Sequence, residues 1–303
     1  MVERVREGVV LLPWADNLLQ VGSSPEHSFV LSGLDEGTTT WLRRLLSRRD
    51  IPPLPSLTPD QLRLVGLLRS HGLVETRRSA TVRDLHLRVV GLSRTTILFT
   101  RLAATSGVSF IDVRDAARVD EEVELLFGPD DLGSLRTEAL KAELSSRRVA
   151  VGRSSRPHLV VSAERRVVDD QRAAQLLRAD LIQLPIVADD RTIQIGPLLV
   201  PDLSPCHMCL EFHRRDCLPT WAKARKLLLR TPLSPPELPL AAAAAGLALH
   251  LVQSLLTPAL RAGAGLPTWA LGTAWRLTES GVEETRWGFH PDCGCRAQHM
   301  YRL

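Results

Sequence analysis

The sequence predicts a two-domain α/β protein: a small winged-helix α+β domain over residues 1–80, then a Rossmann-type α/β domain with a structural zinc site over 81–303. Three observations support this fold class. Short strand patterns followed by helical spacing fill the first domain. From residue 85 onward, apolar runs alternate with helical segments, which is typical of βαβ units and a parallel sheet. The second half of the chain contains two pairs of cysteines; the members of each pair are close in sequence and the two pairs are far apart, which is typical of zinc ligands.

Composition limits the class of protein. A chain of 303 residues is long enough for two domains, and a hydrophobic content of 44% excludes a wholly disordered chain. The net charge of +4 is a mild bias that does not by itself imply a nucleic-acid partner. The opening segment, MVERVREGVVLLPW, lacks the apolar stretch of a cleavable signal. Together with cysteines at zinc-like spacing, this predicts a reducing, cytoplasmic location.

The first domain is expected to contain short strands and two helices. Asp35 occupies the N-cap position of the first helix. Thr58 caps the second helix, with Pro59 at its first position. The prolines of 51–56 exclude a regular helix between them. In order, we expect strands at 9–12, 18–21 and 29–31, helices at 36–48 and 58–71, and a last strand at 73–76.

The charge of this domain narrows its function. Residues 1–80 hold ten arginines, no lysine and nine acidic residues, so they lack the basic face of a DNA-binding winged helix. The same architecture can bind a peptide, because an open edge strand beside a helix accepts an added strand. A domain that only packs against its neighbours is the plain alternative.

The second domain follows a polar linker at 78–84 and begins with a strand, a helix and a strand, expected at 85–90, 95–106 and 108–113. This is the layout of a dinucleotide-binding βαβ unit, whose first loop reads G-x-G-x-x-G. Here the loop reads GLSRTT over 91–96 and keeps the first glycine alone. Nucleotide binding is therefore not expected. Asp112 or Asp115 could meet a ribose, although an aspartate at a strand end is more often a turn or helix cap.

The rest of the second domain alternates in the same way. We expect a helical turn at 138–144, strands at 158–162 and 182–187, helices at 168–178, 221–229 and 240–256, and paired strands at 268–277 and 282–289. The segment 240–256 is the most apolar, but it contains His250 and Gln253 and is short for a membrane span. We therefore expect a buried helix and no membrane partner.

The cysteines indicate a closed structural zinc site. Cys206 and Cys209 form a C-x-x-C pair, and Cys293 and Cys295 lie close together near the end of the chain. Four thiolates fill all positions of a tetrahedral zinc ion, which leaves none open for catalysis. The alternatives are buried free cysteines or a redox C-x-x-C, although a redox pair does not require the second pair. Cys217 is left over and is interpreted as a small core residue.

Longer motifs carry a resemblance to a known family. They are Gly196-Pro197, Pro205-Cys206-x-x-Cys209-Leu210, His213-Arg214-x-Asp216, Pro219-x-Trp221 and His290-Pro291-x-Cys293-Gly294-Cys295, preceded by PEHSFVLSGL (25–34) and HGLV (71–74). With these the second half resembles the ThiF-like, ubiquitin-activating-type fold. The whole chain resembles the ocin-ThiF-like leader-peptide-binding proteins of thiazole/oxazole-modified microcin (TOMM) biosynthesis, with a PqqD-like recognition element at the N-terminus.

The resemblance implies a role in making a ribosomally synthesised, modified peptide (a RiPP), such as a thiopeptide or other azole-containing peptide. The chain would bind the leader of the precursor and present its core to a YcaO-type cyclodehydratase, which forms azolines and azoles. The resemblance also implies a homodimer. By the same resemblance, the leader adds to the third strand and lies against the last helix, with these candidate contact residues: His27, Ser28, Phe29, Val30, Leu31, Leu62, Val65, Leu68 and Arg69.

Catalysis is not expected from the sequence. An active ThiF-type adenylating enzyme carries a glycine-rich loop and an aspartate just after the strand that matches 158–162, where this chain has Ser162 and Ala163. We therefore expect a non-catalytic protein with no catalytic residue, structural Zn²⁺ and no ATP. An active ATP-dependent adenylating enzyme is the alternative, and a winged-helix regulator is a further one that the near-neutral first domain opposes.

Overall fold

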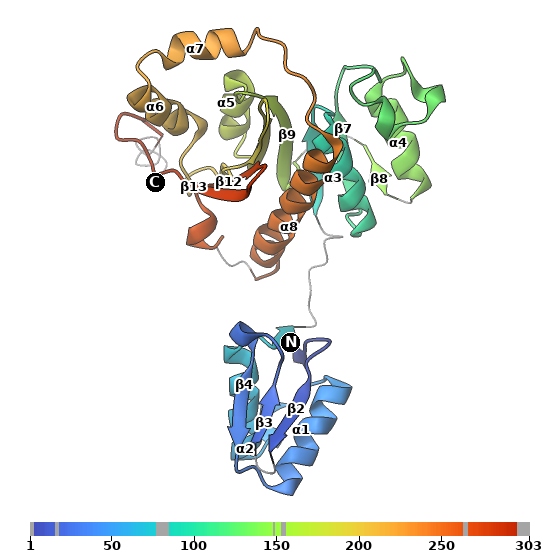
Figure 1. Ribbon diagram of the computed structural model, residues 1–303, viewed down its shortest axis with the longest axis vertical. Coiled ribbons are helices and arrows are strands. Elements are labelled where there is room, and N and C mark those ends of the chain that lie inside the picture. The colour runs from blue at the N-terminus through green and yellow to red at the C-terminus, as the bar shows by residue number, and fades with distance from the viewer. Residues whose placement is uncertain are drawn as a thin grey trace. The chain divides into compact units, whose positions relative to one another are not determined.

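The computed structural model describes residues 3–15, 18–76, 85–147, 149–152, 156–262 and 266–295. The chain divides into two units, Met1–Ser79 and Ala80–Leu303, each with its own core (Figure 1). The linker expected at 78–84 lies outside the described residues. Each unit is described in turn.

The N-terminal unit contains five strands and two helices among its described residues: β1 (Glu3–Val5), β2 (Leu11–Ala15), β3 (Leu18–Val21), β4 (Phe29–Ser32), α1 (Glu36–Arg48), α2 (Pro59–Ser70) and β5 (Val74–Thr76). Strands β2, β3 and β4 form an antiparallel sheet in that order, and β1 pairs with β5 separately. Strand β1 was not expected, because a three-residue strand with two charges shows no apolar pattern. The winged-helix assignment stays a prediction.

The helices of this unit begin where their caps predict. The Asp35 carboxylate accepts a hydrogen bond from the backbone N–H of Thr38 at 2.8 Å and begins α1. Thr58 and Gln61 exchange side-chain and backbone hydrogen bonds in a capping box that begins α2. Both helices bury one face in the core of this unit, which is formed by Val5, Val21, Leu31, Leu42, Leu45, Ile51, Leu64, Val65, Leu68 and Leu73.

The C-terminal unit confirms the α/β prediction. Its strands are β6 (His86–Val90), β7 (Phe110–Arg114), β8 (Ala150–Val151), β9 (Leu159–Arg165), β10 (Gln183–Ala188), β11 (Ile193–Ile195), β12 (Thr273–Thr278) and β13 (Gly281–Arg286). Its helices are α3 (Arg94–Thr105), α4 (Arg136–Ser146), α5 (Asp170–Arg178), α6 (His207–Cys217), α7 (Trp221–Leu228) and α8 (Leu238–Ala262). Strands β8 and β11 and helix α6 were not expected from the sequence.

These strands form one eight-stranded sheet in the order β13-β12-β11-β10-β9-β6-β7-β8. The five strands from β10 to β8 are parallel, and β11, β12 and β13 continue the sheet antiparallel. The first strand of the unit, β6, lies between β7 and β9, so the chain runs outward from β6 in both directions. This is a topological switch point, where parallel sheets of this class form a crevice at the carboxyl ends of the strands.

Helix α8 packs along α3 and supplies a large part of the main core (Figure 1). It has 25 residues and is longer than the expected 240–256. By length and composition alone, its segment Leu238–Leu256 could cross a membrane. Alanines of α8 that face α3 and the sheet are fully buried, among them Ala241, Ala244, Ala245 and Ala248. The apolar pattern of this segment is therefore accounted for by the core of the unit.

A buried ion pair links the neighbouring strands β6 and β7. Asp112 is 2% exposed, and its carboxylate accepts hydrogen bonds from Arg88 at 2.8 Å and from Arg114 at 2.9 Å. Burial by itself would raise the pKa of Asp112, but the two guanidinium groups outweigh burial and hold that pKa below its usual value. The ionised form of Asp112 is therefore part of the folded state.

We expect Asp112→Asn to lower the free energy of unfolding by about 3 kcal/mol or more, because it removes the negative charge that compensates buried arginine. A pKa lowered in the folded state gives stability above the unfolded pKa of about 3.9, which is lost as the pH falls through the folded value. Urea unfolding should therefore show a constant deficit from neutral pH down to about pH 5 that shrinks in more acid solution. Glu283→Gln, on the fully exposed strand β13, is the control. An equal deficit in both variants, or one independent of pH, would contradict this.

Candidate functional site

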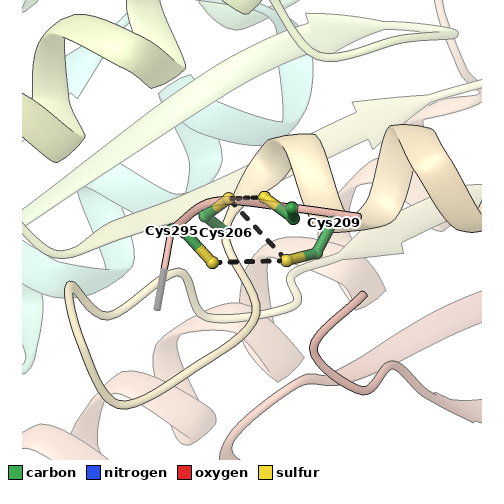
Figure 2. A group of neighbouring side chains, drawn as sticks. Cys206, Cys209 and Cys295 are labelled. Carbon is green, nitrogen blue, oxygen red and sulfur yellow. Dashed lines mark hydrogen bonds between the residues drawn. The ribbon is translucent and has the colours of Figure 1, made fainter. Parts of the chain in front are cut away.

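The four predicted metal ligands come together in space (Figure 2). Their sulfur atoms all lie within 4.8 Å of one another. The Sγ of Cys206 lies 3.9 Å from that of Cys209 and 3.5 Å from that of Cys293, and the Sγ atoms of Cys209 and Cys295 are 3.5 Å apart. Four thiolates at about 2.3 Å from a tetrahedral ion would be about 3.8 Å apart. The donor set and its spacing therefore fit one metal ion with no open position.

Two segments of the chain supply the ligands. Cys206 is the N-cap of α6 and Cys209 lies in its first turn, whereas Cys293 and Cys295 lie in the loop that follows β13. An apolar cluster surrounds the sulfur atoms, formed by Leu199, Leu210, Trp287 and Phe289. Because the two ligand pairs are 87 residues apart in sequence, a bound ion would tie the end of the described chain to α6.

Crowding of the thiols in this apolar setting shifts their pKa values. Burial raises the pKa of Cys206 to about 12, and burial likewise raises the pKa of Cys295. Burial acts in the same direction on Cys209, but hydrogen bonds from the backbone N–H of His290 and from neighbouring thiols lower its pKa. Without a cation, therefore, four thiolates would not coexist here. A divalent cation removes this penalty by binding the ionised form.

The polar residues next to the cysteines hold this loop in place. His290 is buried, and its Nε2 lies 2.7 Å from the Asp216 carboxylate. That hydrogen bond lowers the pKa of Asp216. The His213 ring bonds to the carbonyl oxygen of Gly288 at 3.0 Å. The motif residues outside the cysteines thus join α6 to the C-terminal loop. Cys217 is exposed, so the interpretation of this residue as part of the core is wrong.

The candidate leader-binding residues lie on β4, the turn before it and α2, and they differ in exposure. Phe29 is partly buried and stacks on the His71 ring, with centroids 4.9 Å apart. The His27 ring bonds to the carbonyl oxygen of His71 at 3.1 Å, which links the turn before β4 to the end of α2. Val30 is 59% exposed and Leu62 is 41% exposed. These side chains are open to a ligand.

Other candidate leader-binding residues lie in the core of the unit or form an ion pair within it. Val65 and Leu68 are 0% exposed and Leu31 is 9% exposed. Arg69 forms an ion pair with Glu3 at 2.5 Å, which joins α2 to β1. Val65, Leu68 and Leu31 therefore pack in the core of this unit. Ser28 lies next to Phe29 as a connecting residue before β4.

A cleft of about 180 Å³ opens at the switch point between β6 and β9. Its walls come from the loop after β6, the segment after β7, the carboxyl end of β9, and the proline-rich loop before α8. Its lining includes Gly91, Ser93, Asp115, Glu122, Arg136, Ala163, Arg165, Leu233 and Pro236. Crevices at this place in parallel sheets are where small ligands bind. The cleft is therefore a third candidate site, after the cysteine cluster and the leader-binding residues.

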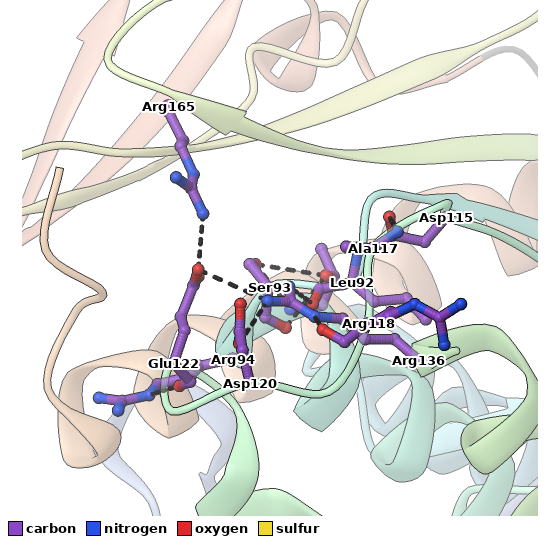
Figure 3. Close-up of polar contacts among 11 residues, drawn as sticks. Leu92, Ser93, Arg94, Asp115, Ala117, Arg118, Asp120, Glu122, Arg136 and Arg165 are labelled. Atoms are coloured by element: carbon purple, nitrogen blue, oxygen red, sulfur yellow. Dashed lines mark hydrogen bonds and ion pairs between the residues drawn. The ribbon is translucent and has the colours of Figure 1, made fainter. Parts of the chain in front are cut away.

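Ion pairs cross this cleft (Figure 3). Arg165, at the end of β9, donates to the Glu122 carboxylate at 2.6 Å. Arg136 is 4% exposed and donates to the carbonyl oxygen of Leu92 at 2.8 Å and to the Asp120 carboxylate at 2.7 Å. An anionic ligand entering the cleft would meet these guanidinium groups and would compete with the two carboxylates for them.

The loop after β6 is stabilised by Asp115. One carboxylate oxygen accepts from the backbone N–H of Leu92 at 2.6 Å and the other from that of Ala117 at 2.8 Å. Asp115 is thus a turn cap in this structure, as its alternative interpretation held. Asp112 is occupied by its ion pairs with Arg88 and Arg114. A ribose or phosphate that accepted a hydrogen bond from the backbone N–H of Leu92 would have to displace the Asp115 carboxylate from it.

Sequence reasoning missed the arginines and carboxylates of the cleft. Glu122, Arg136 and Arg165 lie in three segments whose pairing depends on the strand order. The available signal was a run of acidic residues at 120–122 in a chain rich in arginine. That signal is also typical of an ordinary solvated surface, so it did not single these residues out.

No family model and no curated protein matches the sequence. Solved structures match its fold along nearly the whole chain. Escherichia coli MccB covers 98% of this chain and 97% of its own, with a TM-score of 0.65 and 14% identity. The microcin C7 biosynthetic enzyme MccB in complex with N-formylated MccA covers 98% of this chain and 100% of its own, with a TM-score of 0.68 and 13% identity. PaaA covers 93% of this chain and 99% of its own, with a TM-score of 0.58 and 12% identity.

These matches correct one expectation. A chain without catalytic activity was expected from the altered glycine loop. The proteins that share the fold include one described as a biosynthetic enzyme, and E. coli MccB also has a structure with ATP, which matches with a TM-score of 0.66 at 14% identity. The expected lack of catalysis is therefore contradicted. At these identities the matches establish the fold, and the chain folds as MccB does along nearly its whole length.

Proposed function

We propose that this chain binds the leader of a ribosomally made precursor peptide and takes part in modifying that peptide. The observation that carries the proposal is the open edge of β4 beside α2, in a chain with the fold of a microcin biosynthetic enzyme solved in complex with MccA. The residue motifs shared with the leader-binding proteins of azole-peptide biosynthesis support the same role.

The backbone of β4 would provide the affinity. Among the described residues, β4 pairs with β3 on one side, and its other edge has no strand partner. A peptide added to that edge gains main-chain hydrogen bonds and places alternate side chains against the unit. Phe29 and His71 would contact those side chains at one end of the groove, and Leu62 on α2 would contact them at the other.

The C-terminal unit would work on the core of the bound peptide together with a YcaO-type cyclodehydratase, which forms azolines and azoles. The four cysteines would hold one structural Zn²⁺ in this unit, because four thiolates in a tetrahedral arrangement favour zinc over harder cations. The bound ion would fix the loop after β13 against α6.

ATP-dependent adenylation of a peptide carboxylate is the second candidate function. The cleft at the switch point and the ATP complex of MccB favour it. Arg136 and Arg165 would then neutralise phosphate charge, and Glu122 would leave Arg165 on binding. This reaction would release pyrophosphate, so pyrophosphate exchange measures it directly.

The proposal is tested by titrating a fluorescent candidate leader peptide against the full chain, with and without ATP and Mg²⁺, and by measuring pyrophosphate exchange in parallel. We expect saturable leader binding, and formation of azoline in the core when the cognate YcaO-type enzyme is added. Exchange without leader binding would support the adenylating enzyme alone. The absence of leader binding by a folded, metal-loaded chain would overturn the first proposal.

A further inference from the structure

The N-terminal unit has a pocket between its three-stranded sheet and α1. Its volume is about 400 Å³, which is in the size range of pockets that bind small ligands. The floor of the pocket is apolar and comes from one row across the sheet, because Leu19 of β3 pairs with Pro13 on one side and with Leu31 on the other. Leu34, just after β4, and Thr39 on α1 line the pocket as well. We call this space the α1 pocket.

A β-bulge places Trp14 at the α1 pocket. The two residues of β2 that flank Trp14 pair with consecutive residues of β3, so Trp14 is an extra residue at that point of the strand. A bulge of this kind re-aims a side chain out of the regular alternation of a strand. Trp14 lines the pocket and is nevertheless 70% exposed. A large aromatic side chain that is open to solvent beside a pocket has the properties of a binding hot spot.

Arg43 of α1 gives the α1 pocket a positive charge. It lines the pocket, is exposed, and forms no ion pair with any described carboxylate. Asp35 and Glu36, the acidic residues at the start of α1, do not line the pocket, and none of the other lining residues carries a charge. The pocket therefore combines one cation with an apolar floor, which fits a bulky apolar side chain next to a carboxylate.

The α1 pocket is separate from the groove proposed for the leader, but β4 connects the two. That groove lies between the open edge of β4 and α2, where Phe29 stacks on His71, and neither of these residues lines the pocket. Leu31 lies two residues farther along β4 and forms part of the pocket floor, and Leu34 follows the end of the strand. At about 3.3 Å per residue, a peptide that pairs with the four residues of β4 reaches the pocket with its next few residues.

We propose that the α1 pocket binds a second segment of the same leader peptide, made of one bulky apolar side chain with an aspartate or glutamate next to it. This inference rests on the proposed function and specifies which leaders the chain accepts. The apolar side chain lies on the floor of the pocket against Trp14, and the carboxylate pairs with Arg43. Main-chain pairing at β4 gives affinity, whereas side-chain pockets give specificity. The α1 pocket therefore supplies a selectivity that the strand edge lacks.

The test titrates a fluorescent candidate leader that contains acidic residues against the full, metal-loaded chain and its variants. Trp14→Ala removes the aromatic wall, so we expect the affinity to fall about 30-fold. Arg43→Glu places like charges together, so we expect a fall of about 10-fold or more. Both positions are exposed, so the melting temperature should not change. Arg44→Glu, at the next residue of α1, is exposed and outside the pocket, and this matched control should bind within about twofold of wild type.

Exchanging the charges identifies the leader residue that pairs with Arg43. Each acidic residue of the leader is replaced by lysine in turn, and every leader is titrated against wild type and both pocket variants. We expect one of these leaders to bind wild type weakly and to regain affinity for Arg43→Glu, while none restores binding to Trp14→Ala. Unchanged affinity in both variants, a loss in Arg44→Glu as large as that in Arg43→Glu, or the lack of any restoring leader would overturn the pocket assignment alone.

Two further outcomes separate this inference from the proposed function. A folded wild-type chain that binds no leader overturns both. Variants that bind the leader as wild type does, but no longer support azoline formation with the cognate YcaO-type enzyme, assign the α1 pocket to that enzyme. That result overturns the second leader segment and leaves leader binding at β4 in place.

Discussion

Replacing Cys209 by serine is expected to destabilise the C-terminal unit by about 5 kcal/mol or more, equal to about 10–20 °C in melting temperature. Cys209 is fully buried, and its Sγ lies within 4.8 Å of the Sγ atoms of the three other cysteines of the cluster. Structural zinc in small domains binds with about 10–16 kcal/mol of free energy, and a whole domain is stable by only about 5–15 kcal/mol. Loss of one ligand therefore removes binding free energy that is comparable to the whole free energy of unfolding of the unit. Thermal unfolding and metal analysis of the purified protein measure both effects.

Cys217→Ser is the matched control. This cysteine lies at the other end of the same helix, is exposed, and takes no part in the cluster. We expect it to keep about one zinc per chain and an unchanged melting temperature. A Cys209→Ser variant that is as stable as the control, or wild-type protein purified without a metal and stable to chelators, would show that the cluster is a set of free thiols.

Phe29→Ala is expected to weaken leader binding by about 30-fold, because a partly exposed aromatic residue beside an open strand edge has the properties of a binding hot spot worth about 2 kcal/mol. Its ring stacks on His71 and closes one end of the groove between β4 and α2. The unit should stay folded, because its fully buried residues are untouched. Fluorescence titration with the leader, together with circular dichroism, measures both.

Leu12→Ala provides the comparison for this variant. Leu12 is 40% exposed on β2, at the opposite edge of the same three-stranded sheet. We expect its affinity for the leader to match wild type. If Leu12→Ala loses affinity and Phe29→Ala does not, the peptide adds to the β2 edge. If neither changes the affinity, the leader binds elsewhere.

Local chemistry made several elements predictable from the sequence. The helix expected at 36–48 agrees with α1 at both ends, because Asp35 begins it through a side-chain hydrogen bond that depends on neighbouring residues alone. The second helix follows its threonine–proline start in the same way. Short elements were missed where no pattern can arise, as in the two-residue strand β8. Helix α6 lacks such a start signal, because its N-cap is Cys206, whose side chain makes no capping hydrogen bond.

The sequence by itself predicted the cluster of four cysteines and the α/β class. Cysteine is the residue type that the ion requires, and apolar periodicity follows directly from burial. The tertiary structure alone decided which face of each element is open. The family resemblance made Val65 and Leu68 candidate contacts, yet they lie in the core. Glu122 meets Arg165 only because β9 lies beside β6. Pairings between distant segments depend on strand order, which no local pattern encodes.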